Sequence, residues 1–142
     1  MSRMDKHEAM MQMAEITAQR ATCVRRVVGA VITDVSGIVL ATGFNGVPQG
    51  LSHCNEGNPC AGAKAESGTR LDECLAIHAE QNALIQLPNP REPSNIYVTT
   101  FPCIHCSKML LNTNIQTIYY RELYPGGGWK LWIESGRKEI KL

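Results

Sequence analysis

The sequence has no long hydrophobic run, no excess of charge of one sign and few aromatic residues. No apolar segment approaches the ~18 residues that span a bilayer, and the first eight residues lack the hydrophobic stretch of a secretory signal. We therefore expect a soluble, cytoplasmic protein with no membrane partner. Fourteen basic and thirteen acidic residues leave a net charge of +1. This balance and the lack of a basic stripe with interleaved aromatics argue against a nucleic-acid partner.

Cysteines are too few for a disulfide scaffold, since a chain of 142 residues buries a core without such bridges. Without a secretion signal, metal binding or thiol chemistry explains them better than disulfides. Only the last two are spaced as C-x-x-C. The six positions are Cys23, Cys54, Cys60, Cys74, Cys103 and Cys106.

Hydrophobic periodicity predicts one domain over residues 1–142, with alternating helices and strands. In the first helix, the spacing of Met10, Met13, Ala14 and Thr17 predicts the buried face. The next two strands are almost continuously apolar, which favours burial on both faces. Helices are expected over 3–20, 73–87, 101–112 and 129–134, and strands over 27–33, 38–42, 96–100, 115–120 and 138–142. This order predicts an α/β fold, a three-layer α-β-α sandwich with a mixed five-stranded sheet.

Two short motifs carry the chemistry. His78 and Glu80 lie two residues apart near the start of one expected helix, and Cys103 and Cys106 follow a proline at the start of the next. Two sulfurs and one imidazole are three ligands, which leave a fourth position open as in catalytic zinc sites. Glu80 is then placed to move protons without binding the metal. This H-x-E and P-C-x-x-C combination is the signature of zinc-dependent nucleobase deaminases. A core histidine with a separate redox dithiol is the alternative, and it leaves the joint pattern unexplained.

The segment from 43 to 74 is long and irregular, with six glycines, two prolines and three cysteines. A loop of this length in a compact domain is either disordered or held in place for a function. A second, structural zinc bound by cysteines would hold it, and buried free thiols are the alternative. The candidate ligands are Cys23, Cys54, Cys60 and Cys74, with His53 as a competing fourth ligand.

The chain resembles the deoxycytidylate (dCMP) deaminases of phages and bacteria, a branch of the cytidine deaminase superfamily. The Gly43-Phe44-Asn45-Gly46 element, followed by Pro48, separates this branch from free-nucleoside and tRNA adenosine deaminases. Phe44 replaces the more usual tyrosine. The resemblance covers nearly the whole chain and rests on residues 22–32, 42–50, 53–54, 77–83, 97–106 and 118–120.

The resemblance implies zinc-dependent conversion of dCMP to dUMP, which supplies thymidylate synthesis. It also implies a homohexamer, activated by dCTP with Mg²⁺ and inhibited by dTTP. Some members hold a second, structural zinc, and Cys23 and Cys54 match its positions.

Contacts with substrate and effector are expected on the segments that border the pocket. Phosphate recognition needs cationic or hydroxyl donors, which Arg25, Arg26, Tyr120 and Tyr124 offer, and Tyr120 is the preferred hydroxyl. Asn45-Gly46 is also typical of a tight turn with positive φ. We expect the substrate to contact Asn45, Ala79, Arg26 and Tyr120, and the effector to contact Asn45, Gly46 and Arg25.

Two other functions fit the same motifs. One is a deaminase of another cytosine nucleotide or nucleoside, or of the pyrimidine of riboflavin synthesis. The other is a binding module in which His78, Cys103 and Cys106 brace the fold around zinc without catalysis.

Overall fold

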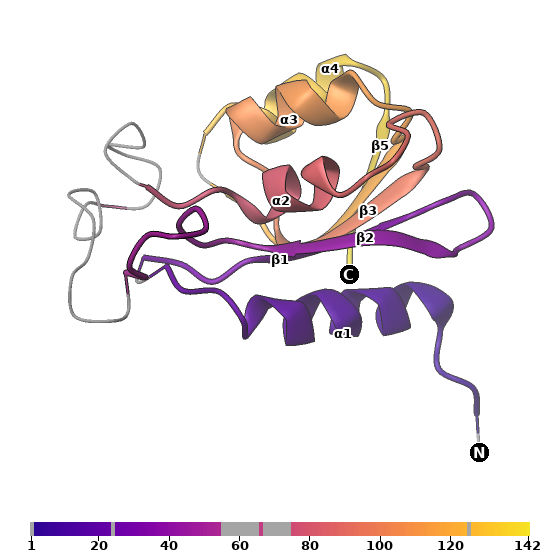
Figure 1. Cartoon of the computed structure of the whole chain (residues 1–142). Helices are drawn as coiled ribbons and strands as arrows, with labels where there is room; N and C mark the ends of the chain where they lie inside the picture. The colour runs from indigo at the N-terminus through magenta and orange to yellow at the C-terminus, as the bar shows by residue number, and fades with distance from the viewer. Residues whose placement is uncertain (1, 24, 55–65, 67–74, 125) are drawn as a thin grey trace.

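The computed structural model describes residues 2–23, 25–54, 66, 75–124 and 126–142. These residues form four helices and five strands in the predicted order (Figure 1). The helices are α1 (Lys6–Ala18), α2 (Ala79–Ile85), α3 (Ile104–Leu111) and α4 (Gly128–Glu134). The strands are β1 (Gly29–Thr33), β2 (Val39–Phe44), β3 (Asn95–Thr100), β4 (Thr117–Glu122) and β5 (Lys138–Lys141).

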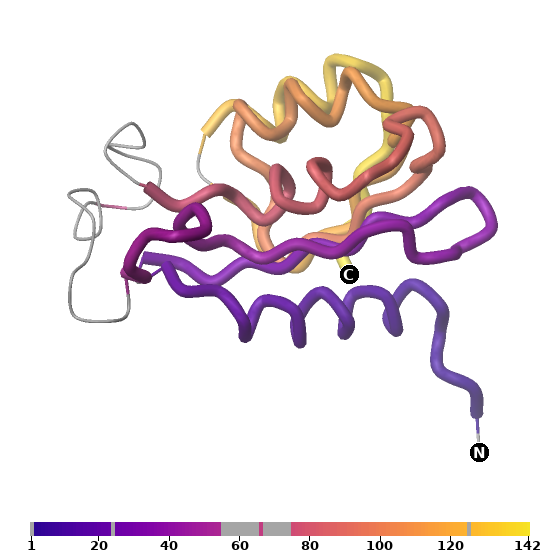
Figure 2. The backbone as a smooth tube through the Cα atoms, viewed as in Figure 1, coloured from indigo at the N-terminus to yellow at the C-terminus, as the bar shows by residue number. Residues whose placement is uncertain are grey.

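The strands form one mixed sheet in the order β2-β1-β3-β4-β5. Strand β1 pairs antiparallel with β2 and β3, whereas β3, β4 and β5 run parallel. Helix α1 covers one face of the sheet, and α2, α3 and α4 cover the other (Figures 1 and 2). The predicted three-layer sandwich is therefore confirmed. None of the helices in the described ranges is long and apolar enough to cross a membrane.

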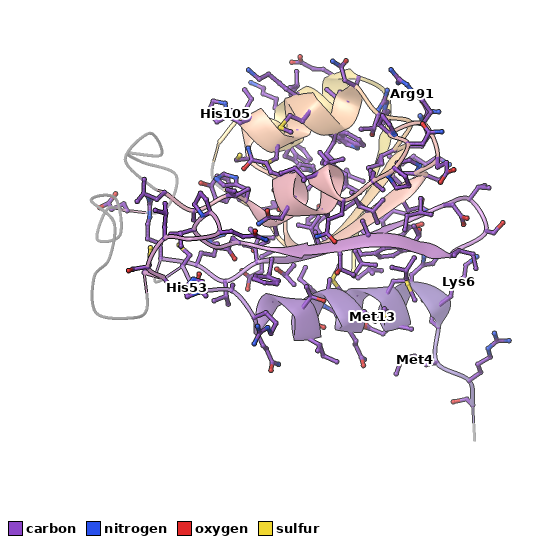
Figure 3. The ribbon with its side chains drawn as sticks, viewed as in Figure 1. Met4, Lys6, Met13, His53, Arg91 and His105 are labelled. Carbon is purple, nitrogen blue, oxygen red and sulfur yellow. The ribbon has the colours of Figure 1, made fainter. Side chains whose placement is uncertain are left out.

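Helix α1 begins after Asp5, whose carboxylate accepts hydrogen bonds from the backbone nitrogens of the next turn. Its buried residues are Met11, Ala14 and Ala18. The predicted face was only partly right, because Met13 is 38% exposed (Figure 3). The small side chains of Ala14 and Ala18 decide the orientation, since they let the helix approach the sheet more closely than methionines would.

Two further expectations were wrong. Helix α2 does not begin at residue 73, because residues 75–78 are extended and Ile77 pairs with Gly46 in a short bridge. Strand β2 is not buried on both faces, because it lies at the sheet edge, where only Ala41 and Gly43 are buried. Strand β1 is buried along its whole length, as expected for a central strand.

The larger core cluster lies between the sheet and the three helices of the second face. Its bulky members include Ile96, Phe101, Leu110 and Trp132. Because this core lies beneath α2 and α3, it holds the beginnings of both helices against the same region of the sheet.

Candidate active site

The beginnings of α2 and α3 carry the predicted metal ligands. His78 is the N-cap residue of α2, and Cys103 is the N-cap residue of α3. The Gln81 side chain accepts a hydrogen bond of 2.8 Å from the His78 backbone nitrogen. The Cys103 carbonyl accepts one of 2.8 Å from the Ser107 nitrogen. Both ligand residues are therefore held by the first turn of their helices.

The fold brings the three predicted ligands together. His78 Nδ1 lies 3.5 Å from Cys103 Sγ and 3.2 Å from Cys106 Sγ. All three donor atoms lie within 4.8 Å of one another, and the two cysteines are buried. His105, between the cysteines in sequence, is exposed on the outer side of α3 (Figure 3). The structure thus separates the ligand pair from the histidine between them.

The protonation of the cluster suits a metal site. Hydrogen bonding from Cys106, with a further bond from His78, lowers the pKa of the Cys103 thiol to about 4. The hydrogen bond with Cys103, together with burial, raises the pKa of the Cys106 thiol. The bond to Cys103 also raises the pKa of His78. One thiolate is therefore already favoured, and thiolates are the form in which cysteine binds metals.

This donor set fits zinc. A tetrahedral ion with bonds of about 2.0 Å to nitrogen and 2.3 Å to sulfur holds its ligand atoms roughly 3.5 Å apart, close to the distances found here. Two sulfurs and one nitrogen leave one coordination position for a non-protein group. His78, Cys103 and Cys106 would hold the ion.

Glu80 lies in the first turn of α2 and is 3% exposed. Burial raises the pKa of its carboxyl above the usual value, although hydrogen bonding with Cys106 opposes this effect. Glu80 also lines a pocket together with two of the ligands, His78 and Cys103. A buried carboxyl at such a place can accept and return a proton during a reaction.

The pocket above the ligands has an apolar wall that the sequence motifs do not indicate. Val28 and Phe101 line it, together with Thr100 at the end of β3. The sequence analysis placed Val28 and Thr100 in strands and Phe101 at the start of a helix, but provided no signal for a ligand contact. Ala79 lines the pocket between His78 and Glu80, as expected for a substrate-binding residue.

The two arginines before β1 differ in their contacts, although both line the pocket. Arg25 donates a hydrogen bond to the backbone oxygen of Glu66. Arg26 stacks over the Tyr124 ring with its guanidinium carbon 5.3 Å from the ring centroid. Within the described ranges, Arg26 Nη1 is shielded from solvent and has no hydrogen-bond partner. Arg26 Nη1 is thus a buried donor that a ligand in the pocket could satisfy.

Of the two tyrosines expected to offer a hydroxyl to the phosphate, Tyr124 lines the pocket and the preferred Tyr120 does not. Tyr120 is buried in the core with its ring edge against Phe101, and burial raises its pKa to about 12. It is not among the described residues that line the pocket, whereas Tyr124 is. Tyr120 follows Ile118 on the sheet face that α2, α3 and α4 cover, which explains its position.

Asn45 lines the pocket, but its amide is also bonded to the backbone on either side of Val27. Asn45 Oδ1 accepts from the Val28 nitrogen at 2.8 Å, and Nδ2 donates to the Arg26 oxygen at 2.6 Å. Gly46 is not among the described glycines with positive φ, and it pairs with Ile77. The tight-turn interpretation of Asn45-Gly46 was therefore wrong.

The second proposed cysteine group is only partly within the described residues. Cys23 is half-buried and lines the pocket, and Cys54 is buried. Cys60 and Cys74 lie outside the described residues. The second zinc therefore stays a prediction.

The chain is similar to known deaminases over most of its length. Residues 4–122 match the family model described as the cytidine and deoxycytidylate deaminase zinc-binding region. The deoxycytidylate deaminase of Mycobacterium phage D29 is 35% identical over 127 residues, which cover 84% of this chain and 97% of the phage protein. That of Schizosaccharomyces pombe is 38% identical over 117 residues.

Structural comparison agrees with the sequence matches. The crystal structure of dCMP deaminase from the cyanophage S-TIM5, in complex with dCMP and dUMP, superposes with a TM-score of 0.79 and 28% identity over the full length of both chains. The match to the S. pombe protein covers 80% of this chain but only 36% of that relative. The chain thus spans about a third of the yeast protein, and nearly all of the phage protein. It belongs to the cytidine and deoxycytidylate deaminase family, in its deoxycytidylate branch.

Proposed function

We propose that the protein deaminates dCMP hydrolytically to dUMP and ammonia. The observation that carries this function is the buried Glu80 carboxyl beside three metal ligands in a pocket that also presents Arg26. The complex of the cyanophage enzyme with dCMP and dUMP supports the same substrate and product here.

The residues of the chain account for the proton transfers. Zinc, when bound by the three ligands, supplies the Lewis acidity that makes water a nucleophile at neutral pH. Glu80 accepts a proton from the attacking water as the water oxygen bonds to C4 of cytosine, and gives that proton to ring N3. Glu80 then transfers the second proton of the water to the amino group, and the C4–N bond breaks to release ammonia. Val28 and Phe101 line the pocket with apolar side chains, against which the apolar faces of the ring could pack.

Arg26 is our candidate for binding the 5′-phosphate. Its buried Nη1 has no protein acceptor in the described part of the chain, and a phosphate oxygen would satisfy it. Stacking on Tyr124 holds the guanidinium in a fixed orientation. We place Ala79 and Asn45 at the nucleoside, because both line the pocket beside the ligands. Tyr120, buried in the core, would need to act through Phe101 rather than by contact.

Several further properties belong to the same proposal by family membership. The protein is a homohexamer, and each chain is a single deaminase domain over residues 1–142. Its location is the cytoplasm, which is that of the host if the chain is viral. The properties also include activation by dCTP with Mg²⁺ and inhibition by dTTP, with Arg25, Asn45 and Gly46 at the effector. A second, structural zinc would involve Cys23 and Cys54, the two candidate cysteine ligands within the described residues.

A turnover assay on four substrates tests the function. We expect ammonia release from dCMP and much slower release from deoxycytidine, because only dCMP offers a phosphate to Arg26. CMP and dCTP complete the set, and each is measured with and without dCTP or dTTP as effector. Equal turnover of deoxycytidine and dCMP would contradict a nucleotide deaminase, and no turnover of any cytosine compound would favour a binding module.

Replacing Arg26 with glutamine should weaken the binding of dCMP selectively. A hydrogen bond to a charged group contributes ~1.5–3 kcal/mol, so we expect KM for dCMP to rise about 10- to 100-fold. KM for deoxycytidine should not change, because that substrate has no phosphate. Arg91→Gln is the matched control, since Arg91 is exposed (Figure 3) and is not among the described residues that line the pocket. An equal rise for both substrates would show that Arg26 does not recognise phosphate.

A further inference from the structure

Helix α2 lies against β2 at a distance that only glycine permits. An ideal Cβ on Gly43 would lie 2.2 Å from the Ala79 carbonyl oxygen and 2.6 Å from the Ala83 nitrogen. Real Cβ atoms essentially never come within 3.0 Å of such an atom. Ala79 joins His78 to Glu80, so Gly43 touches the backbone that carries both functional side chains.

Hydrogen bonds on both sides of Gly43 hold the helix at this distance. Asn82 Nδ2 donates to the Phe44 oxygen at 2.8 Å, and Gln86 Nε2 donates to the Thr42 oxygen at 3.0 Å. Asn82 belongs to α2 and Gln86 is its C-cap residue, and both acceptors belong to β2. Figure 2 shows α2 lying along this edge of the sheet. The close approach is therefore fixed by specific bonds as well as by packing.

A second glycine makes the same kind of contact with the cysteine ligands. Gly128 is the first residue of α4. A Cβ there would lie 2.3 Å from the Pro102 oxygen, 2.8 Å from the Cys103 carbonyl carbon and 2.9 Å from Ser107 Oγ. The backbone at Pro102 and Cys103 places the first sulfur ligand, so Gly128 abuts the second ligand-bearing segment.

The need for glycine at both places is steric. Neither Gly43 nor Gly128 is among the described glycines with positive φ, so alanine can adopt the backbone conformation at either position. An added methyl group would instead push the opposing backbone away by about 1 Å. Functional constellations must be held within ~0.5 Å, and a misplacement of ~1 Å is enough to impair them.

We propose that Gly43 and Gly128 are positioning residues that set the separation of His78 from Cys103 and Cys106. Gly43 lets α2 reach the sheet, and Gly128 lets the first turn of α3 pack against α4. Gly43 contacts the segment that carries His78, and Gly128 contacts the segment that carries the cysteines, so together they set the distances among the three ligand atoms. This inference rests on the metal site of the proposed function and not on the identity of the substrate.

A matched set of alanine variants tests the proposal. Gly43→Ala and Gly128→Ala are compared with Gly29→Ala, whose Cβ would lie 2.0 Å from the Ala14 oxygen and 2.6 Å from the Ala18 nitrogen. That collision is as severe, but it is with α1 on the other face of the sheet, which carries no ligand. Gly127→Ala is a milder control, because its Cβ would meet only the flexible end of Ile104 at 3.2 Å.

The measurements separate metal binding from folding. Zinc affinity is obtained by competition with a chromophoric chelator, the ligand geometry from the visible spectrum of the Co²⁺-loaded protein, and stability from thermal melting of the metal-free protein. We expect Gly43→Ala, Gly128→Ala and Gly29→Ala to lower the melting temperature. Only Gly43→Ala and Gly128→Ala should also lose zinc affinity and change the Co²⁺ spectrum. We expect the affinity to fall by about 10- to 100-fold, as it does when residues that orient metal ligands are replaced.

Three results would overturn the proposal. One is unchanged zinc affinity in both Gly43→Ala and Gly128→Ala. Another is an equal loss of zinc affinity in Gly29→Ala. The third is that Gly43→Ala and Gly128→Ala fail to fold whereas Gly29→Ala folds, which would make Gly43 and Gly128 determinants of the fold alone. If the wild-type protein bound zinc but did not turn over dCMP, the proposed function would fail, and this comparison would still stand.

Discussion

Glu80→Gln should abolish turnover of dCMP while leaving zinc bound. The amide keeps the size and shape of the side chain but can neither accept the proton of the attacking water nor deliver one to N3. General acid–base groups contribute about 10²- to 10⁴-fold in rate, and we expect a loss of kcat in that range. Because Glu80 is buried and burial disfavours its charged form, the neutral amide should not destabilise the fold.

Glu92→Gln is the control for this variant, since Glu92 is exposed and is neither among the ligands nor among the described residues that line the pocket. It should behave as wild type. Zinc content and the melting temperature are measured for both variants together with dCMP turnover. Retention of full activity by Glu80→Gln would refute the assigned proton transfers, even if zinc and dCMP were both shown to bind.

Cys106→Ala should remove one zinc ion per chain together with all measurable activity. Cys106 is fully buried, and its loss leaves only two protein ligands, His78 and Cys103. Lewis acid stabilisation contributes several kcal/mol, so the rate should fall by at least about 10³-fold. We expect two zinc ions per chain in the wild type, one in Cys106→Ala and one in Cys54→Ser, if the second, structural site exists.

His105→Ala is the matched control, because it lies on the same helix turn but is exposed and not among the ligands. It should keep its zinc and its activity. Elemental analysis gives the metal count, and chelation followed by readdition of Zn²⁺ to the wild type tests whether activity returns. One zinc ion per wild-type chain would contradict the second site, and an active Cys106→Ala variant with full zinc would contradict the first.

The catalytic constellation was predictable because its spacing has a local cause. His78 and Glu80 are close in sequence, and Cys103 and Cys106 are one helical turn apart, so short-range geometry orients each pair. The alternation of apolar runs also predicted the order of the elements and the three layers. These signals require no knowledge of which distant segments meet.

Other features depended on long-range packing. Which tyrosine faces the pocket depends on the register of β4 beneath α3 and α4, and that register buries Tyr120 and leaves Tyr124 at the opening. The contacts of the two arginines, Arg25 with the Glu66 backbone and Arg26 with the Tyr124 ring, also join segments far apart in the chain. The face of α1 depends on the small residues that meet Gly29.

What the sequence determined and what only the structure decided differ in how far apart in the chain the interacting residues lie. The identity of the ligands and of the proton-transferring carboxyl is encoded within single turns, so the motifs alone were sufficient to identify a deaminase chemistry. The distance between those turns is set by contacts that residues far apart in the chain make, including those of Gly43 with Ala79 and Gly128 with Pro102. Close packing transmits such contacts to the site, and only the folded chain reveals them.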